Sequence, residues 1–179
     1  MLFRSLYYEP FAAELTDMAL DKRFRGAEIA TMRSSWNDPN ALFVGIKGGK
    51  NGIAHAHQDL GSFAFYALGE RWIQDLGTEG QTYQSHKHHL PGTDFYRIRE
   101  EGHNTLVLNP GPGCSQGRRA EAVFPRFETS PDETLALLDL TAAYSEHAVS
   151  ATRGYRLLDQ RRAFLVQDEI EPKGKADLW

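Results

Sequence analysis

The chain has 179 residues, 41% hydrophobic and 11% aromatic, which is enough to bury the core of one ordinary domain. Its 20 basic and 24 acidic residues give a formal net charge of −4, so no overall positive field favours nucleic acid as a partner. No apolar run is long enough to span a bilayer, and the first residues lack the apolar core of a signal peptide. The single cysteine, Cys114, excludes an internal disulfide and a cysteine-based zinc cluster.

The order of short apolar runs along the chain predicts an all-β fold. Residues 1–22 are poorly patterned, and we expect them to be the end of an upstream domain. Residues 23–179 show many short alternating runs separated by turn signals, which is typical of an antiparallel β-sandwich. The last residues resemble the start of another strand, so we expect this domain to be truncated at its C-terminus. The expected strands cover residues 24–36, 42–46, 62–68, 71–76, 95–99, 104–109, 120–127, 135–139, 148–157 and 162–170.

A candidate metal site is built around residues 48–77. In an extended segment His55 and His57 would point to the same face, because side chains alternate with a period of two. The hairpin formed by the next two strands would return Asp75 to the histidines, and His103 needs only one neighbouring strand to join them. Zinc favours imidazole and carboxylate ligands, and Asp59 could orient one of the imidazoles. Both histidines could be ligands, or one could face a substrate; ordinary polar positions at strand ends fit the spacing equally well.

A second group contains Tyr83, Tyr96, Arg97 and Arg99. A tyrosine beside a cation loses its proton more easily, and an arginine can neutralise a carboxylate with its bidentate fork. On the residues alone, a strand aromatic and solvated arginines explain this group better than a site does. The S-H-K-H-H tract at residues 85–89 is similarly better explained by a solvated basic loop than by a metal site.

Several short motifs over roughly residues 25–110 occur together in one order. They are M-R-S-S-W at 32–36, L-F-V-G-I-K-G-G at 42–49, H-A-H-Q-D-L-G-S-F at 55–63, G-E-R-W-I-Q-D-L-G at 69–77, Y-R at 96–97 and G-H-N-T-L-V at 102–107. In this combination the sequence resembles the heparinase II/III-like polysaccharide lyases, which include heparinases and related alginate and oligoalginate lyases. The resemblance implies an N-terminal α/α toroid followed by antiparallel β-sheet domains, of which this chain would be the first part of the β region.

The resemblance also implies roles for particular residues. His57, Asp75 and His103 match the ligands of a structural zinc ion beside the substrate cleft. His55 matches a histidine that faces the cleft, and either Tyr83 or Tyr96 matches a tyrosine at its border. Arg97 and Arg99 are then candidates for substrate binding.

The reaction that the resemblance implies is β-elimination on a uronic acid of an anionic polysaccharide or oligosaccharide. Other catalytic groups would come from the toroid, so we expect the chain alone to have little or no lyase activity. The full-length protein is expected to be periplasmic or secreted. One alternative is a non-catalytic sandwich that binds carbohydrate or supports a neighbouring domain. Another is a cupin-like metal oxygenase, but the glutamate that should follow the histidine pair is missing, since Glu70 comes too late.

Overall fold

The structure is a computed structural model that describes residues 18–77 and 95–179. Tyr83, the histidine-rich tract at 85–89 and most of the 1–22 lead-in lie outside these residues, so the predictions made for them stay predictions.

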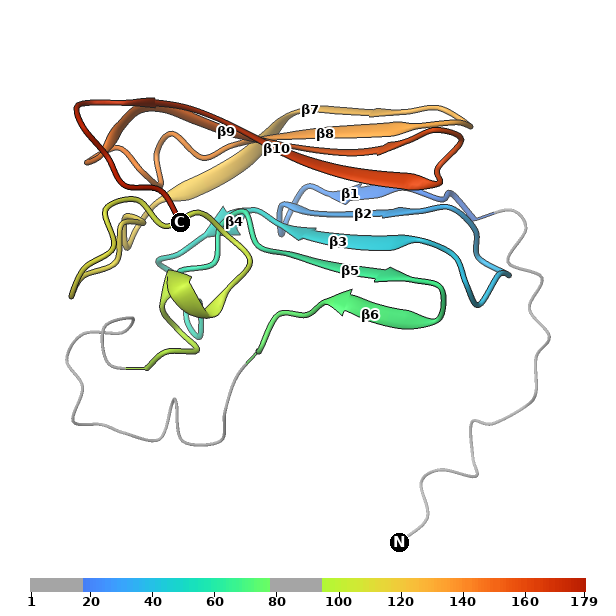
Figure 1. Cartoon of the computed structure of the whole chain (residues 1–179), viewed down its shortest axis with the longest axis horizontal. Helices are drawn as coiled ribbons and strands as arrows, with labels where there is room; N and C mark the ends of the chain where they lie inside the picture. The colour runs from blue at the N-terminus through green and yellow to red at the C-terminus, as the bar shows by residue number, and fades with distance from the viewer. Residues whose placement is uncertain (1–17, 78–94) are drawn as a thin grey trace, which may run out of the picture.

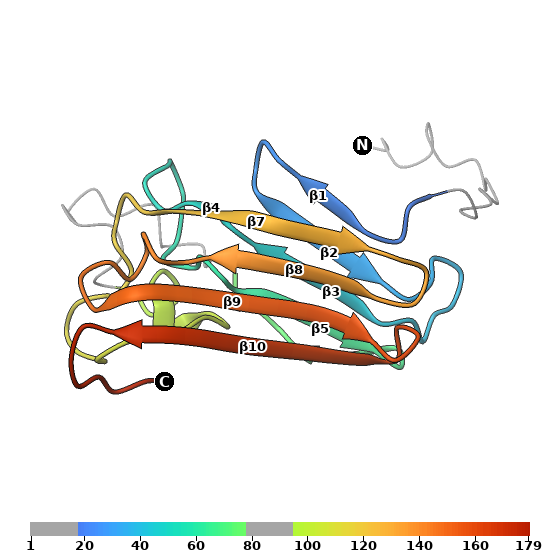
Figure 2. The same ribbon diagram turned by 90° about the horizontal axis from the view of Figure 1, so that it is seen from above.

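Two antiparallel sheets of five strands are stacked face to face (Figures 1 and 2). The first sheet has the order β1-β2-β3-β5-β6, with β1 Lys22–Phe24, β2 Ile29–Arg33, β3 Phe43–Lys47, β5 Phe63–Ala67 and β6 Glu70–Ile73. The second has the order β10-β9-β8-β7-β4, with β4 Gly49–Lys50, β7 Glu121–Thr129, β8 Thr134–Asp139, β9 Ala148–Leu158 and β10 Ala163–Pro172. The predicted all-β antiparallel sandwich is therefore confirmed. The described residues contain a short 3-10 helix, η2 Glu100–Gly102, and no helix long and apolar enough to cross a membrane.

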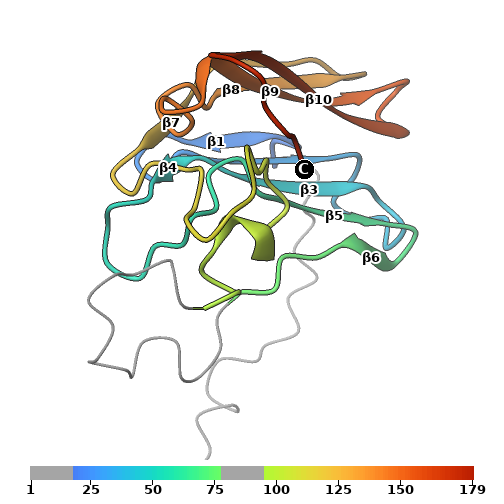
Figure 3. The ribbon, with the colours of Figure 1, turned by 60° about the vertical axis from the view of Figure 1, so that its left-hand side comes forward.

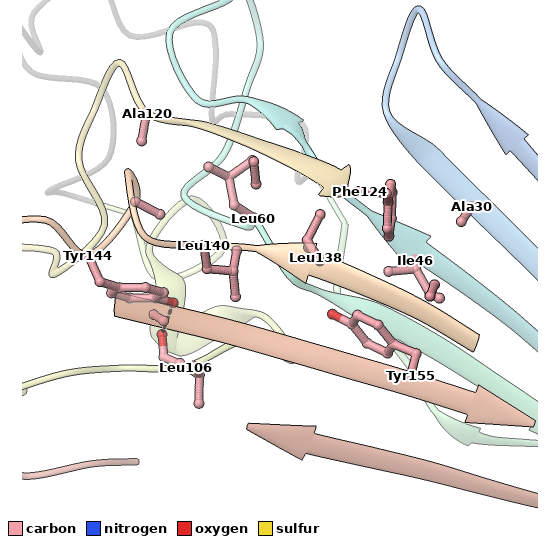
Figure 4. Close-up of a cluster of buried hydrophobic side chains, with 14 of the residues drawn as sticks. Ala30, Ile46, Leu60, Leu106, Ala120, Phe124, Leu138, Leu140, Tyr144 and Tyr155 are labelled. Atoms are coloured by element: carbon pink, nitrogen blue, oxygen red, sulfur yellow. Dashed lines mark hydrogen bonds between the residues drawn. The ribbon is translucent and has the colours of Figure 1, made fainter. Parts of the chain in front are cut away.

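The core lies between the sheets because each strand turns alternate side chains inward. Along β8, for example, Thr134, Ala136 and Leu138 are fully buried while their neighbours are partly exposed. Two buried tyrosines from the second-sheet side, Tyr144 and Tyr155, lie among the aliphatic side chains (Figure 4).

Each of these phenols has a hydrogen-bond partner, as a buried O–H group requires. The Tyr144 hydroxyl donates to the Leu106 carbonyl at 2.6 Å, and the Tyr155 hydroxyl donates to the Gly61 carbonyl at 2.6 Å. Both acceptors lie shortly after a histidine of the predicted site, so the core holds the segments that carry His57 and His103.

Three predicted strands are wrong. Residues 24–36 contain the last residue of β1, a turn and β2 rather than one strand. Residues 95–99 form a turn in which the amides of Ile98 and Arg99 both donate to the Phe95 carbonyl, at 2.9 and 3.2 Å. Residues 104–109 form no strand, and Leu108 makes an isolated bridge to Leu178. Local turn bonds replace the predicted ladder at 95–99, whereas side-chain bonds to the backbone of residues 60–63 hold 104–109.

Candidate metal centre

The segment that carries His57 is a loop between β4 and β5 at one end of the sandwich (Figure 3). The loop reaches β5 through a sharp turn, in which the Ser62 amide donates to the Asp59 carbonyl at 3.0 Å. Gly61 permits this turn, since its φ is +84° and a Cβ there would lie 3.0 Å from a Leu140 methyl group. This turn therefore places His57 and Asp59 immediately before the first-sheet strand that follows.

His57 and His103 meet inside the protein. The Nδ1 atom of His57 lies 3.2 Å from the Nε2 atom of His103, and the two residues are only 6% and 9% exposed. Two nitrogen ligands at about 2.0–2.1 Å from a tetrahedral zinc ion are about 3.3–3.4 Å apart. The observed separation is therefore close to one edge of a zinc tetrahedron, and the donor set fits that ion.

Two carboxylates adjoin the imidazole pair. Ligand atoms of His57, Asp59 and His103 all lie within 4.8 Å of one another. Asp75 lies on the other side of His103, where its Oδ2 atom is 2.8 Å from Nδ1. In this arrangement Asp59 has a ligand atom close to both histidines. Asp75 is instead hydrogen-bonded to Nδ1 of His103, the ring nitrogen that does not contact His57. The sequence predicts the opposite distribution, with Asp75 as the ligand and Asp59 as the orienting group.

The surroundings of His57 and Asp75 favour the protonation state in which each side chain binds a metal ion. Burial lowers the pKa of His57, and the neighbouring His103 lowers it further, which favours the neutral imidazole. Burial opposes ionisation of Asp75, but hydrogen bonds from His103, the Gly77 amide and the Ser62 hydroxyl outweigh it and hold the pKa of this carboxyl well below its usual value. Asp59 also accepts a salt bridge from Lys47, whose ammonium group competes for the same carboxylate.

His55 does not share the buried environment of His57. Its φ is +63°, so the backbone there is left-handed rather than extended, and its side chain is exposed. The same-face arrangement predicted from strand alternation is therefore wrong, because the H-x-H motif lies in a loop. The motif instead separates one buried imidazole from one that faces solvent.

Three of the remaining candidate residues lie in the turn before η2. Tyr96 is 60% exposed. Arg97 donates to the Leu76 carbonyl at 2.8 Å, next to Asp75, so this arginine lies beside the metal centre. Arg99 instead bridges Glu101, at 2.5 and 2.9 Å, and the carbonyls of residues 111–113 at 2.9–3.3 Å. Its guanidinium thus stabilises its own loop, and its role in substrate binding stays a prediction.

Sequence reasoning missed the residues that fix the two histidine segments. The Ser62 hydroxyl donates to Asp75 at 2.8 Å and accepts from the Asn104 amide at 3.2 Å. Arg153 of β9 reaches across from the second sheet and donates to the carbonyls of Gly61 and Asn104, at 3.1 and 3.0 Å. The H-N-T motif at 103–105 is the signal that could have indicated such a framework, since Asn and Thr side chains bond readily to nearby backbone.

A buried side-chain amide completes the framework. Gln116 accepts from the Leu60 amide at 3.2 Å and donates to the Leu60 carbonyl at 2.9 Å, as a neighbouring strand would. It also accepts from Asn51 at 3.0 Å and donates to the Tyr144 hydroxyl at 3.0 Å. Because these groups are buried, the loop that carries His57 is held at both its beginning and its end.

Comparison with known proteins agrees with this geometry. The profile of the family described as Heparinase II/III-like, C-terminal, matches residues 19–178. No curated protein sequence matches the chain. Among solved structures, the heparan sulfate lyase HepC from Pedobacter heparinus superposes with a TM-score of 0.70 at 20% identity, over 90% of this chain and 23% of that one. The heparinase III product of the BT4657 gene superposes with a TM-score of 0.68 at 18% identity, over 89% of this chain and 23% of that one.

At these identities the superpositions establish the fold, and the chain spans less than a quarter of the length of the two structures. The profile match covers nearly the whole chain and includes every strand and both buried histidines. This chain belongs to the heparinase II/III-like family, in the region of its C-terminal domain.

Proposed function

We propose that this chain is the β-sheet part of a polysaccharide lyase that cleaves uronic-acid-containing glycans by β-elimination, with a structural zinc ion beside the cleft. The observation that carries the proposal is the buried contact between His57 and His103, flanked by two carboxylates, within the fold of this family. The names of the matched structures, a heparan sulfate lyase and a heparinase, support an acidic polysaccharide as the substrate class. We further propose that the full-length protein acts in the periplasm or outside the cell.

In β-elimination the C5–H bond of the uronate breaks, a C4–C5 double bond forms, and the C4–O4 bond breaks as O4 takes up a proton. The step needs a cation or hydrogen-bond donor at the uronate carboxylate, a base at C5 and an acid at O4. On this chain His55 and Tyr96 are exposed, and we propose that they face the substrate; Tyr83 is a further candidate. Arg97, which donates to the Leu76 carbonyl next to Asp75, is the cation that we propose for the uronate carboxylate. We propose that the remaining catalytic groups come from another domain of the full-length protein.

His57 and His103 would hold the zinc ion together with Asp75, Asp59 or both. The ion would crosslink the loop before β5 to the segment after η2, a structural role, because a site filled by protein ligands leaves no open position for substrate. His57 and His103 then fix the loop in which His55, two residues before His57, faces the solvent. This separates a histidine that holds the site from one that meets the glycan.

The metal content of the purified chain tests the zinc site. We expect one zinc per chain by elemental analysis, and loss of the metal in His57→Ala and in His103→Ala. His147→Ala is the matched control, since this histidine lies outside the centre and contacts Asn109. A wild-type chain that is folded but takes up no zinc would refute the site, and with it the zinc-containing form of the proposal.

Activity tests the reaction on the full-length protein. We expect ultraviolet absorbance from an unsaturated uronate product, and a loss of kcat of about 100-fold or more in His55→Ala if His55 transfers a proton. Full-length protein that holds zinc but releases no unsaturated product from any acidic glycan would favour the non-catalytic carbohydrate-binding alternative. Residues 1–179 alone are expected to show little or no turnover.

A further inference from the structure

A row of aromatic and arginine side chains crosses the outer face of the first sheet. Arg33, Phe43, Tyr66 and Arg71 are direct cross-strand partners on β2, β3, β5 and β6. Trp36 extends the row beyond Arg33, whose guanidinium carbon lies 3.4 Å from the Trp36 ring centroid. We call these five residues the arginine–aromatic row.

The row faces away from the core. The residues adjacent to three of its members, Met32, Val44 and Ala67, are buried in the sandwich, so the row occupies the opposite face of the same strands. It lies where β2 and β5 end and where β3 and β6 begin, at the opposite end of the sheet from the loop between β4 and β5 (Figure 1). It is therefore separate from the metal centre.

Contacts within the row hold its arginines against rings. Arg33 lies between Trp36 and Phe43, at 3.4 and 4.8 Å from the two ring centroids. Phe43 meets Tyr66 edge to face at 5.9 Å, and Arg71 lies 5.0 Å from the Tyr66 centroid. A guanidinium stacked on rings is already ordered, so less conformational entropy is lost when its N–H groups bind a ligand.

Neither arginine of the row uses its guanidinium N–H groups within the described part of the chain. The Arg33 side chain makes no hydrogen bond or ion pair there, and its buried Nε has no partner. Asp21 acts on Arg33 electrostatically, but both oxygens of that carboxylate are bound to Arg161. The Arg71 side chain likewise makes no hydrogen bond or ion pair among the described residues, and its guanidinium lies over the Tyr66 ring. Arg126, by contrast, pairs with a neighbouring glutamate through two N–H groups.

These features match the chemistry of an acidic sugar. A guanidinium fork binds a carboxylate or sulfate through paired hydrogen bonds, and a partly exposed ring offers an apolar surface to the C–H face of a pyranose. Since neighbouring strands lie about 4.8 Å apart, the row from β2 to β6 spans about 15 Å. That length gives an extended chain of sugars a cation at either end and rings between.

We propose that the arginine–aromatic row is a second binding surface for an acidic saccharide, with Arg33 and Arg71 as the anion-binding groups. The choice of an acidic saccharide rests on the proposed lyase function; the existence of an anion-binding row rests on the contacts described above. The row positions the glycan at a distance from the metal centre and takes no part in bond breaking.

Calorimetric titration of the zinc-loaded chain with a heparan sulfate oligosaccharide tests the row. We expect Arg33→Gln and Arg71→Gln each to raise Kd about tenfold, since a lost hydrogen bond to a charged group is worth at least that factor. Arg33→Lys should weaken binding nearly as much, because lysine keeps the charge but loses the stacked fork. Arg162→Gln, which removes an exposed surface charge paired with Asp159, should change Kd less than twofold. The carboxyl-reduced, desulfated oligosaccharide should bind none of the proteins measurably.

The Kd values of the arginine variants test the row alone. Unchanged affinity in both Arg33→Gln and Arg71→Gln overturns the proposal, as does an equal loss in Arg162→Gln, which would indicate a general charge effect. Arg71 is exposed, so its variant remains informative if Arg33→Gln fails to fold. Zinc content of the wild-type chain tests the proposed function, whereas the Kd values of the two arginine variants test the row, so the two failures are distinguishable.

Discussion

The buried ion pair between Asp21 and Arg161 provides the sharpest test of how this sandwich is held together. The two residues are 140 positions apart, and the Arg161 guanidinium donates to both Asp21 oxygens, at 2.9 and 2.7 Å. Their side chains are 1% and 4% exposed, respectively. The Thr134 hydroxyl also donates to Asp21 at 2.6 Å, and Arg161 donates to the Arg33 carbonyl at 2.9 Å. The pair therefore joins the chain just before β1 to the β9–β10 turn.

Asp21→Asn should destabilise the fold strongly. It removes the negative charge while leaving Arg161 buried and uncompensated, which costs about 3–5 kcal/mol of unfolding free energy. For a domain of this size, about 2–4 °C of Tm is lost per kcal/mol, so we expect Tm to fall by about 6–20 °C. Circular dichroism during heating and urea titration would measure both quantities.

The matched control is Asp159→Asn, which breaks the exposed pair with Arg162, whose side chains are 58% and 67% exposed. We expect it to cost less than about 1 kcal/mol. Asp21→Leu combined with Arg161→Met should recover much of the loss, since it removes both buried charges together. If Asp21→Asn unfolds no more easily than Asp159→Asn, the pair does not hold the sheets as reasoned here.

Three further predictions concern acid stability and the framework of the metal centre. Burial opposes ionisation of Asp21, but hydrogen bonds from Arg161 and two threonines hold the pKa of this carboxyl below its usual value. Its contribution to stability is therefore complete above the unfolded-state pKa of about 3.9 and is lost as pH falls through the folded-state pKa; urea titrations across acid pH should show a flatter profile in Asp21→Asn. Gln116→Leu should lower both unfolding free energy and zinc stoichiometry, because it leaves the buried backbone amide of Leu60 without its acceptor, at about 1–3 kcal/mol; equal zinc content at unchanged stability would contradict this. Gly102→Ala should cost about 1–3 kcal/mol in the same titration, since its Cβ would lie 2.2 Å from the Tyr96 carbonyl oxygen.

The sheets could be predicted from the sequence because their strands bury alternate residues. β8 and β9 follow the predicted ranges within two residues, and β9 turns residues such as Tyr155 and Leu157 inward. Alternation failed where side chains bond to backbone. Thr105 donates to the Leu60 carbonyl at 2.5 Å, and Asn104 donates to the Phe63 carbonyl at 2.9 Å. Those bonds hold the segment against the turn before β5 and the first residue of β5, where no ladder forms.

Spacing along the chain was also insufficient to place the two histidines of the H-x-H motif. Period-two spacing places His55 and His57 on one face only if the backbone between them is extended, and the left-handed φ of +63° at His55 removes that condition. The resemblance of the sequence to the family implies that His57 and His103 are partners, and the structure brings these two rings into contact. The sequence could not identify the burial of one histidine and the exposure of the other, which depend on the turn at Gly61 and on the contacts of Gln116.

Which carboxylate would face a bound metal ion is decided by the orientation of the His103 ring. An imidazole has two nitrogens on opposite sides, so His103 can meet His57 through Nε2 while Nδ1 holds Asp75. Residues outside the motif hold Asp75 there: the Ser62 hydroxyl and the Gly77 amide donate to its oxygens at 2.8 and 3.0 Å. Rotating the ring would exchange the two nitrogens, and spacing along the chain is the same in both cases. Zinc affinity in Asp59→Asn and Asp75→Asn therefore reports the ring orientation: the ligand variant should lose the metal, whereas the orienting variant should weaken it about 10–100-fold.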